Sequence, residues 1–258
     1  LAGQAPTEGR IVPYPIDLPD SFAEAIERGT RTANGRPGAR YWTNHAHYRI
    51  EAKVDVAKAR LSGTAWLTYR NRSPVELDRL VLHAYQDLMK AGAQRTRNVV
   101  ATPGFELGEV RLAGKPVRTR VVDTRFTVRL PEALQPNAEV TLEVDWAFAI
   151  PKAGTAPRMG HEADKVVYLG YWYPQFAVFD DVEGWVADPH RGNGEFYMGY
   201  ADYELAITAP QGYLVRATGE LQNADQVLTE KARNALAAAL QPGNREDVHV
   251  ITKEDHEA

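Results

Sequence analysis

A two-residue alternation of apolar and polar side chains over residues 140–150 constrains the fold of this chain more than any other feature. The apolar positions are Val140, Leu142, Val144, Trp146, Phe148 and Ile150. Successive side chains of a β-strand point to opposite faces of the sheet, whereas a helical pattern repeats about every 3.6 residues. This segment therefore predicts a strand with one face on a core, long enough to cross a large sheet.

The same alternation recurs through much of the chain. It predicts a strand over residues 45–56, a turn over 57–60 and a partner strand over 64–70. Further strands are expected over residues 77–84, 109–112, 117–122, 125–130, 203–207 and 213–217. Short strands without intervening helices indicate a mostly β fold, in the form of a large antiparallel sandwich or saddle.

Helical patterns occur in only two places. Residues 1–40 are rich in Pro, Gly and Thr and predict an extended arm with one short helix over 20–29, in which Ser21 and Glu24 form a capping box and Gly29 ends the helix. The second predicted helix covers residues 225–240. We therefore divide the chain into an N-terminal arm, 1–40, and a β-domain, 41–258.

Composition excludes several classes of function. The formal net charge of -4 offers no general attraction for nucleic acid or for anionic lipid. No stretch approaches the roughly 18 apolar residues that a membrane-spanning helix needs, so no membrane span is expected. The chain has 0 cysteines, which excludes disulfides and thiolate metal sites and leaves the cellular compartment open.

The segment over residues 168–221 sets an aromatic run beside an acidic turn. It reads YLGYWYPQFAVFDDVEGWVADPHRGNGEFYMGYADYELAITAPQGYLVRATGEL. Its aromatic side chains are Tyr171, Trp172, Tyr173, Phe176, Phe179 and Trp185. Such a group either fills the core at the open end of the sandwich or lines a groove for a peptide, a sugar or another domain.

The acidic residues of this segment favour a structural role. Asp180, Asp181 and Glu195 offer hard oxygens of the kind that calcium prefers, but their spacing does not match a calcium-binding loop. We assign Asp180, Asp181, Trp185 and Glu195 to shaping the loop. His45 and His47 share one strand face without an identifiable third ligand, which indicates a surface or interface role. No catalytic residue and no metal ligand is assigned.

Two blocks of the sequence resemble one known family. The aromatic-Pro cluster, the F-D-D turn and the run GEFY…YADYELAITAPQGYLVRATGEL are similar to the N-terminal β-domain of zinc aminopeptidases of the aminopeptidase N family, in particular its bacterial and often exported branch. Residues 41–86, YWTNHAHYRIEAKVDVAKARLSGTAWLTYRNRSPVELDRLVLHAYQ, are similar to the opening strands of the same domain. The resemblance implies a periplasmic or secreted protein, while the residues themselves leave a cytoplasmic location open.

The catalytic motif of that family is absent. Its members hold zinc through H-E-x-x-H on a following domain. Here the pair His161-Glu162 leads to Lys165, an ammonium that cannot bind zinc, and the G-x-M-E-N substrate loop is missing as well. The resemblance therefore implies a non-catalytic domain that caps a C-terminal catalytic domain of the same polypeptide and forms one wall of its peptide cleft. It also implies that this domain holds no cofactor itself. Zinc is expected in that missing domain, and the β-domain is expected to stop before its last strands, leaving an unpaired sheet edge.

The resemblance also implies site residues. In related aminopeptidases this region faces the cleft and a glutamine holds the α-amino group of the substrate, which points to Gln175 with Tyr171, Trp172 and Tyr173. We expect Trp172, Tyr173 and Phe176 to be partly exposed around Gln175. The alternative is a free-standing β-sandwich module that binds peptide or glycan through residues 171–185. A third possibility, a hydrolase using the acidic turn, has no supporting motif. An H-E-x-x-H encoded beyond Ala258 would separate the first two.

Overall fold

The computed structural model describes residues 17–96, 98–156, 158–163 and 165–257. Contacts between residues divide the chain into two compact units, with the boundary after Thr208. The first unit therefore includes the described part of the N-terminal arm together with all the strands.

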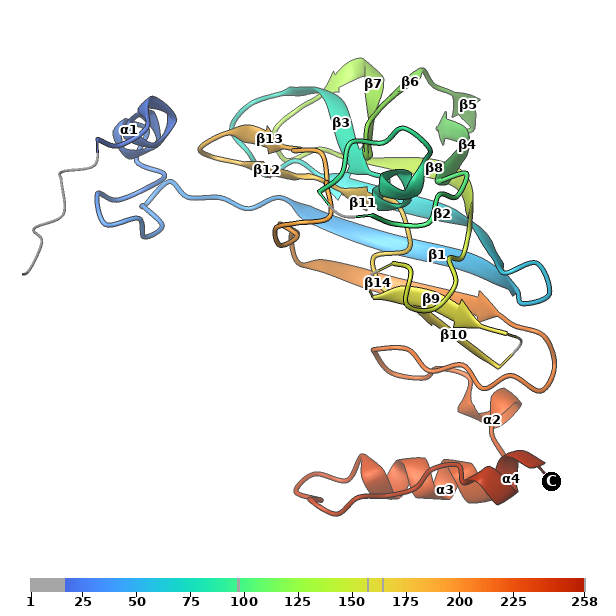
Figure 1. Cartoon of the computed structure of the whole chain (residues 1–258). Helices are drawn as coiled ribbons and strands as arrows, with labels where there is room; N and C mark the ends of the chain where they lie inside the picture. The colour runs from blue at the N-terminus through green and yellow to red at the C-terminus, as the bar shows by residue number, and fades with distance from the viewer. Residues whose placement is uncertain (1–16, 97, 157, 164, 258) are drawn as a thin grey trace, which may run out of the picture. The chain divides into compact units, whose positions relative to one another are not determined.

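The first unit is built on two β-sheets (Figure 1). The larger sheet has the order β14-β1-β2-β8-β4-β5. Its strands are β14 (Ala201–Thr208), β1 (His45–Asp55), β2 (Arg60–Arg70), β8 (Glu139–Ala149), β4 (Phe105–Leu112) and β5 (Lys115–Pro116). The smaller sheet has the order β11-β3-β7-β6. Its strands are β11 (Gln175–Phe176), β3 (Leu77–His83), β7 (Arg125–Leu134) and β6 (Thr119–Val122).

Two hairpins complete the first unit. They pair β9 (Met159–Glu162) with β10 (Val166–Leu169), and β12 (Val178–Asp180) with β13 (Gly184–Val186). The predicted mostly β, sandwich-like fold with antiparallel sheets is confirmed. One pair departs from the pattern, because β14 runs parallel to β1 over eight positions, from Ala46↔Ala201 to Lys53↔Thr208.

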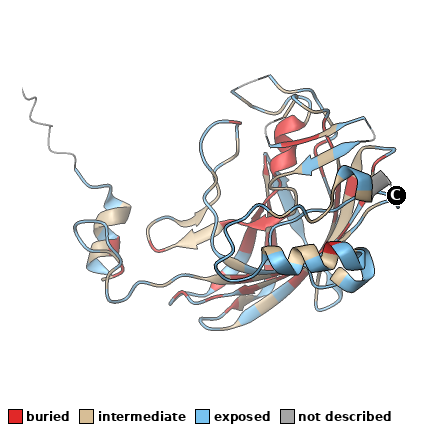
Figure 2. Ribbon diagram, turned by 90° about the horizontal axis from the view of Figure 1, so that it is seen from below, coloured by how far each residue is buried: buried red, intermediate tan, exposed pale blue. Residues whose placement is uncertain are grey.

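The predicted apolar faces form the core. Strand β1 buries every second side chain, among them Tyr48 and Ile50, and β8 buries Phe148 completely. Ring contacts join the two sheets, since Phe105 of β4 stacks on Phe126 of β7 with ring centroids 6.3 Å apart. Figure 2 shows the buried residues gathered along the strands. Burial of one face per strand is the main driving force for this arrangement.

The arm helix α1 (Asp20–Glu27) ends as predicted but starts differently. Gly29 takes a φ of 74°, its N–H donates to Ile26 O at 2.9 Å, and Thr30 N–H donates to Ala25 O at 3.0 Å. This is the Schellman geometry for which glycine is suited. The predicted capping box is wrong: the N-cap is Pro19, and Ser21 Oγ instead donates to Glu183 Oε1 at 2.8 Å.

The second unit corrects two predictions. The single predicted helix over 225–240 is two helices, α2 (Ala224–Val227) and α3 (Glu230–Ala239). The break occurs because Thr229 adopts an extended conformation and acts as a new N-cap, its side chain accepting the Ala232 N–H at 3.2 Å. The predicted strand over 213–217 is absent, since no described strand pairs with it. A short α4 (Lys253–Glu257) follows. None of the described helices is long and apolar enough to cross a membrane.

Sequence patterns also missed a short 3-10 helix, η1 (Tyr85–Met89), which follows β3. All five of its residues are buried. Asp87 holds it against the larger sheet by accepting the Phe105 N–H at 2.7 Å and an ion pair from Lys90 at 2.9 Å. Burial raises the pKa of the Asp87 carboxyl even though these partners act to lower it.

Candidate site at the aromatic cluster

The two sequence blocks converge on Tyr48, in the first half of β1. Its ring stacks on Tyr203 of β14 at a centroid distance of 5.0 Å and meets Tyr173 at 5.6 Å and Phe176 at 5.7 Å. The Phe176 N–H donates to Tyr48 Oη at 3.0 Å. Strands β1, β11 and β14 therefore bring rings from residues 41–86 and 168–221 into one aromatic cluster, which we define as Tyr48, Trp172, Tyr173, Phe176 and Tyr203.

The outer rim of the cluster is open to solvent. Trp172 and Tyr173 are half-buried with ring centroids 5.2 Å apart, and Tyr203 is 50% exposed. Tyr173 Oη donates to Tyr203 Oη at 3.2 Å. Burial raises the pKa of the Tyr203 phenol, so this hydroxyl remains protonated near neutral pH. The rim offers flat apolar surface with hydroxyl groups at its edge.

Tyr171 belongs to a neighbouring group and not to this cluster. Its φ of 42° is unusual for a bulky residue and turns its ring toward Phe196, at 4.8 Å, and Tyr85, at 5.7 Å. Its carbonyl accepts a hydrogen bond from Gln86 Nε2 at 3.0 Å. The predicted trio of Tyr171, Trp172 and Tyr173 is thus divided between two ring groups.

Gln175 lies in a buried polar row across the smaller sheet. It stands opposite His83 of β3, which stands opposite Arg125 of β7. Gln175 is 6% exposed and His83 is 5% exposed. Gln175 Oε1 and His83 Nδ1 are buried and have no hydrogen-bond partner among the described residues.

The imidazole of His83 is held neutral by its surroundings. Burial lowers its pKa to about 4, and the nearby His190 and Arg125 act in the same direction. The ring of Tyr85 stacks on it with centroids 4.8 Å apart. A neutral imidazole has one donor and one acceptor nitrogen, so His83 Nδ1 has an unused donor or acceptor according to the tautomer, and Gln175 Oε1 has an unused acceptor.

The expected exposure of Phe176 is wrong. Phe176 is 5% exposed because its ring lies between Tyr48 and Tyr69, with a centroid distance of 4.9 Å to Tyr69. Only Trp172 and Tyr173, out of the three residues expected around Gln175, reach the surface.

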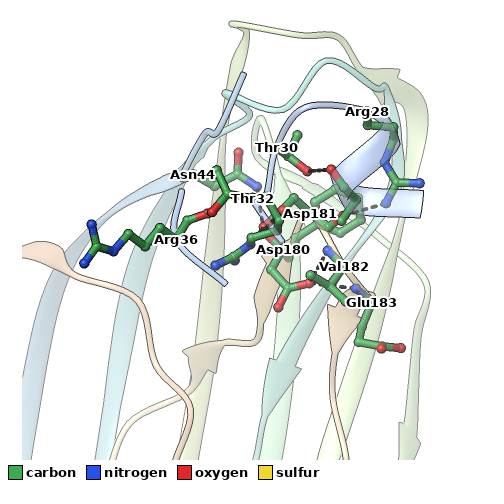
Figure 3. A network of polar contacts seen from close by, with 12 residues as sticks. Arg28, Thr30, Thr32, Arg36, Asn44, Asp180, Asp181, Val182 and Glu183 are labelled. Atoms are coloured by element: carbon green, nitrogen blue, oxygen red, sulfur yellow. Dashed lines mark hydrogen bonds and ion pairs between the residues drawn. The ribbon is translucent and has the colours of Figure 1, made fainter. Parts of the chain in front are cut away.

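The acidic turn between β12 and β13 is structured by two different contacts (Figure 3). Asp180 Oδ1 accepts the backbone N–H groups of Val182, at 3.0 Å, and Glu183, at 2.8 Å. The Asp181 carboxylate instead binds Arg31 of the arm, which donates from Nε at 2.9 Å and from a terminal nitrogen at 2.7 Å. Burial acts to raise the pKa of Asp181, but these hydrogen bonds hold that pKa below its usual value.

The remaining loop residues differ in their surroundings. Trp185 packs against Phe179 at 5.2 Å and Tyr69 at 5.7 Å, so it anchors the β12–β13 hairpin on the larger sheet. Glu195 is exposed and pairs with Arg158 at 3.7 Å. Such an exposed pair contributes little to stability.

His45 and His47 each pair with an acid of β14. His45 Nε2 lies 3.0 Å from Asp202 Oδ2, and His47 Nε2 lies 3.3 Å from Glu204 Oε1. Among the residues that the structure describes, no group of three or more His, Asp or Glu is arranged to hold a metal ion.

Sequence reasoning did not identify Arg31, His83 or Tyr203 as part of this region. Arg31 lies in the arm, which the Pro and Gly content marked as separate. Tyr203 has a usable signal, because it begins the predicted 203–207 strand. Its partner in the ladder is Tyr48 of β1, a strand far from it in the sequence. Nothing local in the sequence marks His83 as buried.

Comparisons with known proteins give partial structural matches only. No protein-family profile matches the chain, and no curated protein matches it. A crystal structure of an M1 zinc metallopeptidase from Deinococcus radiodurans shares 18% identity, covering 49% of this chain and 26% of that one, with a TM-score of 0.32. A two-domain M1 zinc metallopeptidase E323A mutant bound to L-arginine shares 16% identity, covering 69% of this chain and 35% of that one, with a TM-score of 0.37. Yeast LTA4 hydrolase in complex with bestatin shares 14% identity over 54% of this chain and 20% of that one, with a TM-score of 0.32. The chain spans about a quarter of the length of the first of these structures.

Proposed function

We propose that this chain is the non-catalytic N-terminal β-domain of a zinc aminopeptidase-like protein, in which it caps a catalytic domain and forms one wall of a cleft for peptides. The observation that carries the proposal is the convergence of both family-like sequence blocks on one aromatic cluster with an open rim of Trp172, Tyr173 and Tyr203. In the same proposal, zinc is bound by residues of the catalytic domain and the protein works in the periplasm or outside the cell.

The rim has the chemistry that such a wall needs. Exposed rings that end in a hydroxyl give large contact area together with a hydrogen-bonding group, which is typical of surfaces that bind peptides or another domain. Partly exposed apolar surface of this kind commonly marks an interaction site.

Gln175 has a more limited part in the proposal. Its free Oε1 is the acceptor that a substrate ammonium would satisfy, but the atom is buried beside His83. A substrate would therefore reach Gln175 only after a local opening of the chain around it. We assign the first contact with substrate to Trp172 and Tyr173.

Trp172→Ala tests whether Trp172 forms part of the proposed cleft wall. In the full-length protein we expect weaker substrate use, seen as a higher KM, or weaker docking of the two domains, while the melting temperature of the 258-residue chain changes little because Trp172 is half-buried. The matched control is Phe148→Ala, which removes a fully buried ring and should cost about 3 to 5 kcal/mol. Collapse of the chain on Trp172→Ala would show that the rim is core and that the wall hypothesis is wrong.

The isolated chain should bind no stoichiometric zinc and hydrolyse no aminoacyl substrate. The reason is that the zinc ligands and the water-activating glutamate of H-E-x-x-H are missing from its sequence. Metal analysis and a chromogenic aminopeptidase assay are the measurements. One tightly bound zinc per chain with turnover would overturn the proposal, and tight binding of a peptide or glycan to the chain alone that Trp172→Ala abolishes would favour the free-standing module.

A further inference from the structure

Strand β14 lies at one end of the larger sheet, opposite the end formed by β5. One of its edges pairs with β1 over eight positions, and no strand among the described residues pairs with the other edge. A free edge presents a row of backbone N–H and C=O groups, which is a template for a further strand. Strand β14 contains no proline or lysine, two of the residues that commonly protect such edges.

The apolar face of the larger sheet continues from β1 onto β14, where its side chains are partly exposed to solvent. Tyr203 and Leu205 stand opposite Tyr48 and Ile50 of β1 in the parallel register. The two β1 residues are 4% and 2% exposed, whereas Tyr203 and Leu205 are 50% and 41% exposed. The apolar stripe of the sheet therefore runs to the free edge and ends in solvent.

The other face of β14 is acidic. Asp202 and Glu204 have side chains that are 75% and 67% exposed, and their ion-pair partners are His45 and His47. Along the edge, acidic and apolar side chains thus alternate.

We propose that the free edge of β14 docks an extended peptide segment in which apolar residues alternate with lysine or arginine. The segment would add one strand to the sheet, with backbone hydrogen bonds supplying affinity and side chains supplying selectivity. Its apolar residues pack beside Tyr203 and Leu205, and its basic residues lie beside Asp202 and Glu204. This inference does not depend on the proposed function.

A basic peptide fits this edge better than a second copy of β14. If two copies paired antiparallel about Glu204, that residue would face itself. Pairing about Tyr203 would place Asp202 opposite Glu204, and pairing about Leu205 would leave both acids opposite uncharged residues, without a compensating charge. Like charges directly opposite each other destabilise a strand pair, whereas opposite charges stabilise it.

The test uses the 258-residue chain and three blocked octapeptides, which match the eight residues of β14. The probe alternates lysine with valine, and the controls alternate glutamate with valine and lysine with serine. We expect the lysine–valine peptide to bind at least tenfold more tightly than either control in a titration by calorimetry. Its affinity should fall as salt is added, because the exposed charges are screened.

Variants of β14 separate the contribution of charge to peptide binding from that of apolar contact. Asp202→Lys with Glu204→Lys should reverse the preference between the lysine–valine and glutamate–valine peptides. Leu205→Ser should weaken lysine–valine binding about tenfold without changing charge, by loss of apolar contact. The matched control is Glu132→Lys with Glu139→Lys, two exposed acids on β7 and β8 whose replacement changes net charge equally and should leave the preference intact.

Hydrogen exchange shows whether the edge is free. Without peptide, the outward-facing amides of β14 should exchange quickly, and the lysine–valine peptide should slow them. Slow exchange without peptide would overturn the proposal, because the chain itself would then cover the edge. Equal binding of the lysine–valine and glutamate–valine peptides would also overturn it. So would self-association that Leu205→Ser abolishes, which would assign the edge to a second copy.

Discussion

Asp181→Ala should release the N-terminal arm from the β12–β13 hairpin. The Asp181 side chain is 1% exposed and the Arg31 side chain is 18% exposed, so the substitution leaves a guanidinium largely buried without its carboxylate. Removing one partner of a buried pair costs about 3 to 5 kcal/mol. Limited proteolysis within residues 20–41 should accelerate by at least about 100-fold, since each 1.4 kcal/mol is a factor of about ten.

Glu106→Ala is the control for this substitution. Glu106 binds Arg60 through two hydrogen bonds of 2.6 and 2.7 Å, a geometry like that of Asp181 with Arg31, but the two side chains are 42% and 37% exposed. An exposed pair contributes about 0 to 1 kcal/mol. Equal effects of the two substitutions on stability and proteolysis would contradict the role given to burial.

Folding stability should fall in mild acid because of His83. The pKa of His83 is lowered to about 4 in the folded chain, mainly by burial, against 6.5 for a free imidazole. The unfolded chain therefore binds one more proton than the folded chain between these two values. The His83 contribution is complete above about pH 6.5 and is lost progressively toward pH 4, by about 3 kcal/mol.

Urea unfolding at several pH values measures this loss. His83→Phe should flatten the dependence of the free energy of unfolding on pH between 6.5 and 4, whatever its effect on absolute stability. His249→Gln, which removes an imidazole in the second unit, controls for the loss of a histidine elsewhere. If His83→Phe keeps the wild-type slope, His83 is not held neutral in the folded chain.

The strands of the larger sheet could be predicted from sequence because their signal is local. In β8 and β1, alternate side chains face one core, and the period of two is visible within a single segment. The parallel pairing of β1 with β14 could not be predicted in the same way. An alternating strand has the same pattern whichever neighbour it takes and in whichever direction that neighbour runs.

The candidate site was predictable in composition but not in geometry. The sequence located the aromatic run, yet which rings are buried depends on partners far along the chain, as Phe176 between Tyr48 and Tyr69 shows. The contact of Arg31 with Asp181 joins residues 150 positions apart and has no local signal at all. The break between α2 and α3 does have a local signal, because Thr229 has the chemistry of an N-cap.

The parallel ladder between β1 and β14 also affects the order of folding. His45 and Asp202 lie 157 positions apart, so β14 can join the sheet only after most of the chain has been synthesised. Non-local pairings of this kind form slowly because a long loop must close first. During that delay the edge of β1 that later pairs with β14 is uncovered. Newly made chains thus pass through a period in which this edge of β1 can pair with other chains.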